Sequence, residues 1–197
     1  MTPDPPDLPD LLAFGAAHVD RVARADGAAV LGTSNPGRVR ARPGGVARNA
    51  VETASRLGAR CRLVTRLGRD PEATLVAASQ PEGVLAALPP IAGAATASYT
   101  AILDVTGELV VGLADMGVYD TIDPDEALAA LGPARRLLLD ANLPVATLAA
   151  LVDRAGALSI PVAAIGVSIA KVARLAALVD RLDLRFVNRA EARALPR

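Results

Sequence analysis

From Leu11 onwards, short apolar runs alternate with longer segments of helical periodicity, and this alternation restricts the possible folds more than any other feature. Apolar runs cover residues 136–140 and 160–165, and a segment of helical periodicity, residues 144–157, lies between them. Parallel strands joined by crossover helices produce this βαβ order. We therefore predict an α/β fold built on a mostly parallel sheet.

The same reading assigns the remaining elements. Strands are expected at residues 11–19, 61–67 and 182–187, and helices at 45–57, from Pro124 to Gly132, at 168–179 and from Asn188. Two β-rich runs, 96–104 and 108–114, flank a turn and predict a hairpin. The polar segment 28–43 is expected to hold short strands outside the main sheet. Asp123 and Asn142 are candidate helix caps.

The composition argues against some partners. The 21 basic and 21 acidic residues cancel, so no net charge attracts nucleic acid or an anionic membrane. Two tyrosines, two phenylalanines and no tryptophan leave few rings for stacking on single-stranded nucleic acid. We expect no nucleic-acid partner and no membrane span, since prolines and glycine interrupt the longest uncharged stretch, 83–103.

The single cysteine and the N-terminus both favour a cytoplasmic location. Cys61 has no second cysteine for an internal disulfide, which fits a reducing compartment. Residues 1–10 are acidic and proline-rich, without the basic and apolar regions of a signal peptide, and we expect a disordered tail there.

Polar side chains and glycines gather where the predicted strands end. These positions are 18–20, 44–45, 140–142, 166–168 and Asn188. Ligands of open parallel sheets bind at the carboxyl ends of the strands. Gly44 and Gly45 also precede a helix, so backbone N–H groups and the helix N-terminus are accessible to an oxygen-rich ligand. This edge of the sheet is therefore the expected site.

A longer motif begins at these glycines and consists of Gly44-Gly45, Asn49, Leu57-Gly58 and Leu67-Gly68-Arg69-Asp70. It resembles the N-terminal signature of ribokinase-like (PfkB-type) carbohydrate kinases. Further matches are Asp20, 96–99, 140–142, Val167-Ser168 with Lys171, and Asn188 with Glu191. The resemblance implies a three-layer α/β/α kinase domain over residues 11–197, with a small β lid formed by segments about 28–43 and 95–114. Residues 33–37 and 114–116 are similar to the pseudouridine kinase branch; adenosine-type, ribose and fructose-phosphate relatives stay open.

The resemblance also implies roles for individual residues. Substrate-binding positions would be Asp20, Asn35, Gly44, Gly45, Asn49, Tyr99 and Asp140. Asn188 and Glu191 would bind the ATP cofactor, with Glu191 also next to Mg²⁺. Each has an ordinary structural alternative: Asp20 and Asn35 can stabilise turns, and Asn188 with Glu191 can cap a helix. The sole histidine, His18, is either a base or structural.

The sequence departs from the family pattern at one important place. The glycine-rich Asp-Thr-x-Gly-Ala-Gly-Asp run is absent, and with it the catalytic aspartate and the anion hole, so no catalytic residue is assigned. We expect a C-terminally truncated kinase that phosphorylates a ribose 5′-hydroxyl weakly or not at all as an isolated chain. The alternative is a non-catalytic protein that binds a nucleoside or docks a partner. Expected partners are a small nucleoside or sugar, a second copy through the lid, or a complementing C-terminal polypeptide beside strand 182–187.

Overall fold

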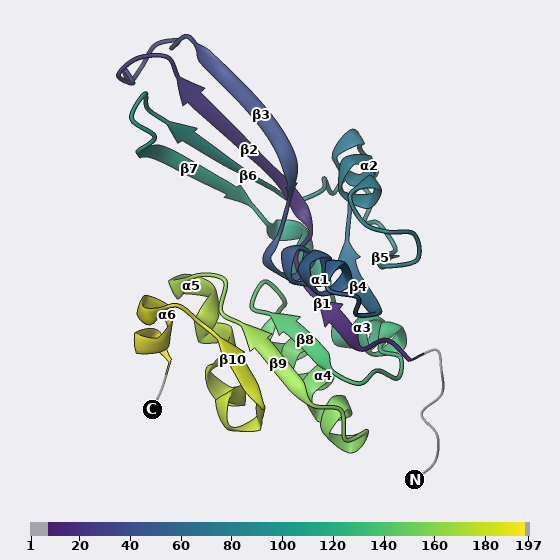
Figure 1. Cartoon of the computed structure of the whole chain (residues 1–197). Coiled ribbons are helices and arrows are strands. Elements are labelled where there is room, and N and C mark those ends of the chain that lie inside the picture. The colour runs from purple at the N-terminus through teal and green to yellow at the C-terminus, as the bar shows by residue number, and fades with distance from the viewer. Residues whose placement is uncertain (1–7, 196–197) are drawn as a thin grey trace.

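The computed structural model describes residues 8–195 and contains two sheets, the larger of which forms the centre of the molecule (Figure 1). All its pairings are parallel, in the order β10-β9-β8-β1-β4-β5. The strands are β1 (Leu11–Phe14), β4 (Cys61–Arg66), β5 (Leu85–Leu88), β8 (Leu137–Asp140), β9 (Val162–Ile165) and β10 (Leu184–Phe186). The predicted parallel α/β sheet is confirmed.

Helices connect these strands. They are α1 (Val46–Arg56), α2 (Pro71–Ala78), α3 (Pro124–Ala130), α4 (Val145–Ala157), α5 (Ile169–Val172) and α6 (Arg189–Ala194), with 3₁₀ segments η1 (Gly117–Thr121) and η2 (Ala173–Arg181). Asp123 caps α3 through its side chain, as predicted. Asn142 does not cap α4, because Pro144 occupies the cap position.

Alternating side chains of the central strands divide the core into two layers. Leu12 and Phe14 of β1 belong to one buried cluster, together with residues of α3 and α4. Ala13, between them, belongs to the other cluster, with residues of α1 and α2. Since successive strand residues point to opposite faces, helices must cover both faces of the sheet. The result is a three-layer α/β/α arrangement.

The second sheet projects from the carboxyl-end side of the first (Figure 1) and has the order β3-β2-β6-β7. Its strands are β2 (His18–Ala25), β3 (Gly37–Gly44), β6 (Ser98–Leu103) and β7 (Leu109–Asp115). β6 and β7 form the predicted antiparallel hairpin, and β3 lies in the segment expected to leave the main sheet. We call this four-stranded sheet the lid.

The prediction of one strand over residues 11–19 is wrong. The chain leaves the main sheet after Phe14 and enters the lid at His18. Between them, a Cβ atom on Gly15 would lie 2.4 Å from the Asp140 carboxylate, so only glycine permits this close passage. The apolar run continues unbroken through the turn, and for that reason periodicity could not show the change of sheet.

Other differences concern short elements. α2, β5 and η1 were not predicted, and the expected helix 168–179 is a four-residue α5 followed by the 3₁₀ segment η2. Within residues 8–195, no helix is both long and apolar enough to cross a bilayer.

Helix α4 supplies much of the core on its face of the sheet, and its packing can be tested. Leu148 is fully buried there, so Leu148→Ala leaves a cavity and should lower the free energy of unfolding by about 2–5 kcal/mol. Leu57→Ala is the control, because Leu57 is largely exposed and its loss should cost below about 1 kcal/mol. Urea denaturation measures both. Equal effects would contradict the assigned core.

Candidate functional site

The site begins at the base of the lid, where Asp20 stands on β2. Its carboxylate lies 3.1 Å from Nε2 of His18 and 3.8 Å from Nε of Arg42, and 22% of the side chain is exposed. The cross-strand partners of Asp20 are Arg42 and Tyr99, so all three side chains share one face of the lid. Asp20 is therefore a partly open hydrogen-bond acceptor between cationic and aromatic neighbours.

Gly44 and Gly45 join the lid to helix α1 directly beside this carboxylate. A Cβ on Gly44 would lie 2.5 Å from Oδ2 of Asp20, and one on Gly45 would lie 2.3 Å from the carbonyl oxygen of Ala16. Gly45 also has φ 105°, in the region that side chains disfavour. Both positions therefore require glycine, and the backbone of α1 begins close to Asp20.

Asn49 lies one turn into α1 and is exposed. Its Oδ1 accepts a hydrogen bond of 2.9 Å from Arg48, a buried residue whose guanidinium also contacts Glu52 at 2.9 Å. The same guanidinium reaches the carbonyl oxygen of Pro43 at 3.5 Å. Arg48 therefore ties the Asn49 side chain to the end of β3, just before the two glycines, while the Asn49 amide nitrogen stays available.

Asp140 lies beneath these residues, fully buried at the end of β8. Its carboxylate accepts N–H groups from Ala16 at 2.7 Å and Asn142 at 2.9 Å, and the Ala47 N–H also contributes. Burial raises the pKa of Asp140, and these donors oppose the shift. In this structure Asp140 stabilises the floor of the site and offers no open surface to a substrate.

Asn35 lies apart from this group, in the exposed loop between β2 and β3. Its Oδ1 accepts from the Val30 N–H at 2.8 Å, and its amide donates to the carbonyl oxygens of Val30 and Thr33. The side chain therefore holds the loop at the tip of the lid, the turn role that the sequence left open for it. Its expected contact with a base stays a prediction.

Asn188 and Glu191 form the capping box of α6 at the end of β10. Oε2 and Oε1 of Glu191 accept from the Asn188 backbone N–H and side-chain amide at 3.0 Å and 2.8 Å. Within residues 8–195, no group of three His, Cys, Asp or Glu side chains is placed to hold a metal ion. The present arrangement therefore serves the helix, and the expected ATP and Mg²⁺ contacts stay predictions.

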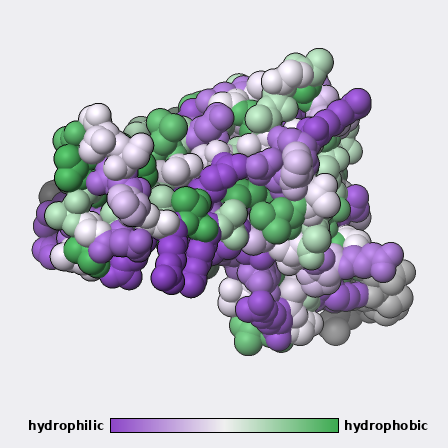
Figure 2. Space-filling view, turned by 90° about the horizontal axis from the view of Figure 1, so that it is seen from above, coloured by the Kyte–Doolittle hydropathy of each residue, from purple (hydrophilic) through white to green (hydrophobic). Residues whose placement is uncertain are grey.

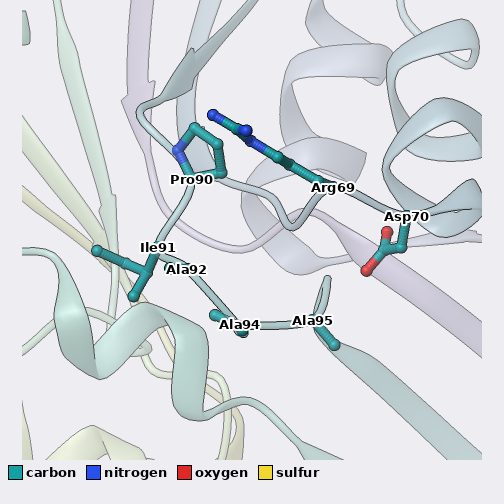
Figure 3. A pocket seen from close by; sticks show the side chains of 8 residues that line it. Arg69, Asp70, Pro90, Ile91, Ala92, Ala94 and Ala95 are labelled. Carbon is teal, nitrogen blue, oxygen red and sulfur yellow. The ribbon is translucent and has the colours of Figure 1, made fainter.

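A cavity of about 420 Å³ lies elsewhere, between the loops that follow β4 and β5. Figure 3 shows Arg69 extending over Pro90, and the Asp70 carboxylate turned towards Ala95. That carboxylate caps α2 and accepts from the backbone and hydroxyl of Thr96 at 2.7 Å and 2.6 Å. It is occupied in holding two loops together, and none of the predicted site residues lines this cavity.

Tyr119 was missed by sequence reasoning, although it fixes the lid to the sheet. Its buried hydroxyl donates to the carbonyl oxygen of Ala17 at 2.7 Å and accepts from the Ala17 N–H at 3.0 Å. Burial raises the pKa of Tyr119 far above its usual range. Because Tyr119 lies just after β7 and Ala17 just before β2, one side chain clamps the entrance and exit of the lid.

The structure therefore gathers Asp20, Gly44, Gly45, Asn49 and Tyr99 around the junction of lid and sheet, with Asp140 below them. It leaves Asn35 at the lid tip and the Asn188–Glu191 pair near the β10 edge. A parallel α/β/α sandwich with a β lid beside the strand ends is the arrangement that the sequence led us to expect for a ribokinase-like domain.

The sequence matches the description "pfkB family carbohydrate kinase" over residues 8–197. The chain belongs to this family. It is 28% identical over 191 residues to the pseudouridine kinase of Escherichia coli (strain K12), covering 94% of this chain and 60% of that protein. Pseudouridine kinase of Arabidopsis thaliana is also 28% identical, over 92% of this chain and 49% of its own length.

Solved structures agree on the fold. A carbohydrate kinase from Agrobacterium tumefaciens superposes with a TM-score of 0.84 at 38% identity, over 94% of this chain and 62% of that one. Arabidopsis thaliana ribokinase complexed with ribose and ATP gives a TM-score of 0.75 at 16% identity, over 95% and 62%. The expected ribokinase-like fold is confirmed, and the chain spans 49% to 62% of the length of these relatives.

The His18–Asp20 pair should make stability depend on pH. Burial lowers the pKa of His18, and the Asp20 charge only partly opposes this. The unfolded chain therefore binds a proton more readily, so the free energy of unfolding should fall as the pH drops below about 6.5, by at most about 1.4 kcal/mol per pH unit. Urea denaturation at pH 7.5 and pH 5.5 measures this change.

His18→Gln is the control for that measurement, because His18 is the sole histidine. The variant should show a flatter dependence over this interval. A slope that persists unchanged in the variant would assign the titration to other groups.

Proposed function

We propose that this chain forms the acceptor-binding part of a nucleoside kinase of the pseudouridine kinase type, a phosphotransferase that acts on a ribose 5′-hydroxyl. The observation that carries the proposal is the partly open Asp20 carboxylate directly above Gly44 and the start of α1. A carboxylate can accept hydrogen bonds from two hydroxyl groups of a sugar. The 28% identity to two pseudouridine kinases supports the choice of nucleoside.

Each residue then has a defined task. Asp20 accepts hydrogen bonds from ribose hydroxyls, and the Asn49 amide donates to one of them. His18 and Arg42 hold the carboxylate in place. Tyr99 lies on the same lid face with its ring extending over Gly112 of β7, and we assign it the border of the site on that side. Asp140 holds the backbone beside the start of α1 in place through its bond to Ala16. The sugar is therefore oriented by groups that are fixed relative to one another.

We propose ATP and Mg²⁺ binding only for a whole kinase of this family, not for this chain alone. The described residues do not form a metal site on their own, and both oxygens of Glu191 are engaged by Asn188. Lys171, partly buried on α5 after the carboxyl end of β9, has a pKa lowered by burial and is the cation we assign to a phosphate. We assign transfer itself to no residue of this chain.

The remaining part of such a fold would pair with β10. Among the described strands, β10 pairs with β9 alone, and Leu184 and Phe186 are half exposed on it. The outer edge of such an edge strand is a template for another strand. A complementing polypeptide, or further residues of the same scaffold, would cover this edge and complete the donor side.

Nucleoside binding tests the proposal without requiring turnover. Calorimetry should detect pseudouridine binding to the purified chain, and Asp20→Asn should weaken it about tenfold or more, because a charged acceptor is lost. Asp115→Asn is the matched control: it lies on the opposite lid face and should bind normally. A folded chain that takes up no nucleoside would favour the alternative, a protein that docks partners without binding a nucleoside.

The lid face opposite Asp20 supports a dimer. Val39, Ile102 and Val111 lie in one cross-strand row there, and Leu113 lies one row away; all four are exposed. Seen from above, hydrophobic residues stand on the surface among hydrophilic ones (Figure 2). A second copy packed against this face would bury the row and stabilise both lids.

Leu113→Asp should shift such a dimer towards monomer, because it places a charge in the buried row. Light scattering across a concentration series measures the effect. Leu158→Asp, on an exposed site after α4, should leave the mass unchanged. A wild-type chain that stays monomeric at high concentration would contradict the dimer.

A further inference from the structure

Four arginines line the lid face that carries Asp20. Strand β3 places Arg38, Arg40 and Arg42 at alternate positions, so their side chains point to the same side. Arg24 on β2 is the direct cross-strand partner of Arg38. The row begins at the proposed sugar site and continues to the outer half of the lid, about 13 Å along the strand at roughly 3.3 Å per residue.

This arrangement is unfavourable without an anion. Like charges directly opposite one another destabilise an antiparallel pair, as Arg24 and Arg38 must. Arg42 has the Asp20 carboxylate within 3.8 Å, and Arg24 donates to the carbonyl oxygen of Val105 at 2.7 Å. Among the described residues, no carboxylate forms an ion pair with Arg38 or Arg40. Two guanidinium groups therefore remain uncompensated.

The same arginines line a cavity of about 530 Å³ between β2, β3 and the β6–β7 turn. Its wall is formed by Val22, Arg24, Ala25, Asp26, Arg38, Arg40, Leu103 and Val105. Three arginines against one aspartate leave two positive charges in excess there. The volume is typical of sites for small molecules, and apolar residues make up the rest of its lining.

We propose that this cavity is a binding site for a small phosphate-bearing molecule, with Arg24, Arg38 and Arg40 as its phosphate ligands. Guanidinium groups bind phosphate oxygens through paired, charge-assisted hydrogen bonds. The size of the cavity favours an oligophosphate or a nucleotide over a polymer. The zero net charge and the scarcity of aromatic residues argue against nucleic acid. The site uses none of the residues assigned to the sugar, so it does not rest on the proposed nucleoside kinase function.

Inorganic tripolyphosphate is the probe, titrated calorimetrically into the purified chain at low ionic strength. Binding is expected, and the double variant Arg38→Gln/Arg40→Gln should weaken it at least about tenfold. Relief of the charge repulsion should also leave this variant at least as stable as the wild type when no anion is present. At the same concentration, tripolyphosphate should raise the unfolding temperature of the wild type more than that of the variant.

Arg154→Gln/Arg193→Gln is the matched control. Both residues are exposed and lie outside the lid, and the double substitution removes the same amount of positive charge. An equal loss of tripolyphosphate affinity in this control would show that the effect is general charge attraction, and it would overturn the proposed site. So would binding of a single-stranded oligonucleotide with no binding of tripolyphosphate.

Two further measurements distinguish free oligophosphate from a nucleotide as the ligand, and the phosphate site from the proposed sugar site. If Arg38→Gln/Arg40→Gln weakens the binding of both ATP and tripolyphosphate, the site binds phosphate groups whether or not they belong to a nucleotide. If it weakens the binding of tripolyphosphate alone, the site binds free oligophosphate. Either result supports the proposal. Asp20→Asn should lose pseudouridine and keep tripolyphosphate, so failure of the nucleoside assignment would be visible separately.

Discussion

The buried carboxylate of Asp140 is the interaction on which the rest of the site depends. It ends a central strand, accepts the N–H of Ala16 at the exit to the lid, and lies close enough to the N–H of Ala47 at the start of α1 for that group to lower its pKa. Three segments far apart in sequence therefore converge on one charge. Burying a carboxylate is costly unless donors surround it, and here the donors are backbone groups that would otherwise be unsatisfied at a turn and a helix end.

Tyr119 complements this anchor from the lid side. Because its hydroxyl bonds both backbone groups of Ala17, the lid cannot shift at β2 without disturbing the segment after β7. Asp20 lies three residues beyond Ala17, and Gly44 lies against Asp20. The position of the candidate acceptor group is therefore determined by two buried polar clamps, and only the outer part of the lid is free of them.

Much of this could be predicted from the sequence because the signals were local. The Gly44–Gly45 pair before an amphipathic helix, the Asp123–Pro124 cap and the 96–114 hairpin each depend on neighbouring residues, and the structure confirms them as elements. The clamps could not be predicted, since Asp140 and Ala16 are 124 positions apart and Tyr119 and Ala17 are 102 apart. The junction between β1 and β2 was hidden for a different, local reason: the apolar run continues through it without interruption, so no break in the pattern marks the change of sheet.

Although the chain has no net charge, its lid has one cationic face and one apolar face. Strict alternation along β3 directs Arg38, Arg40 and Arg42 to one side and Val39 and Ala41 to the other. A shift of register by one residue would exchange the faces, placing arginines in the apolar row and valine beside Asp20. Pairing of His18 with Gly44 fixes that register at the base, where the Asp20 carboxylate leaves no room for a Cβ on the opposing residue. The glycine required beside the Asp20 carboxylate therefore also decides which side of the lid is cationic.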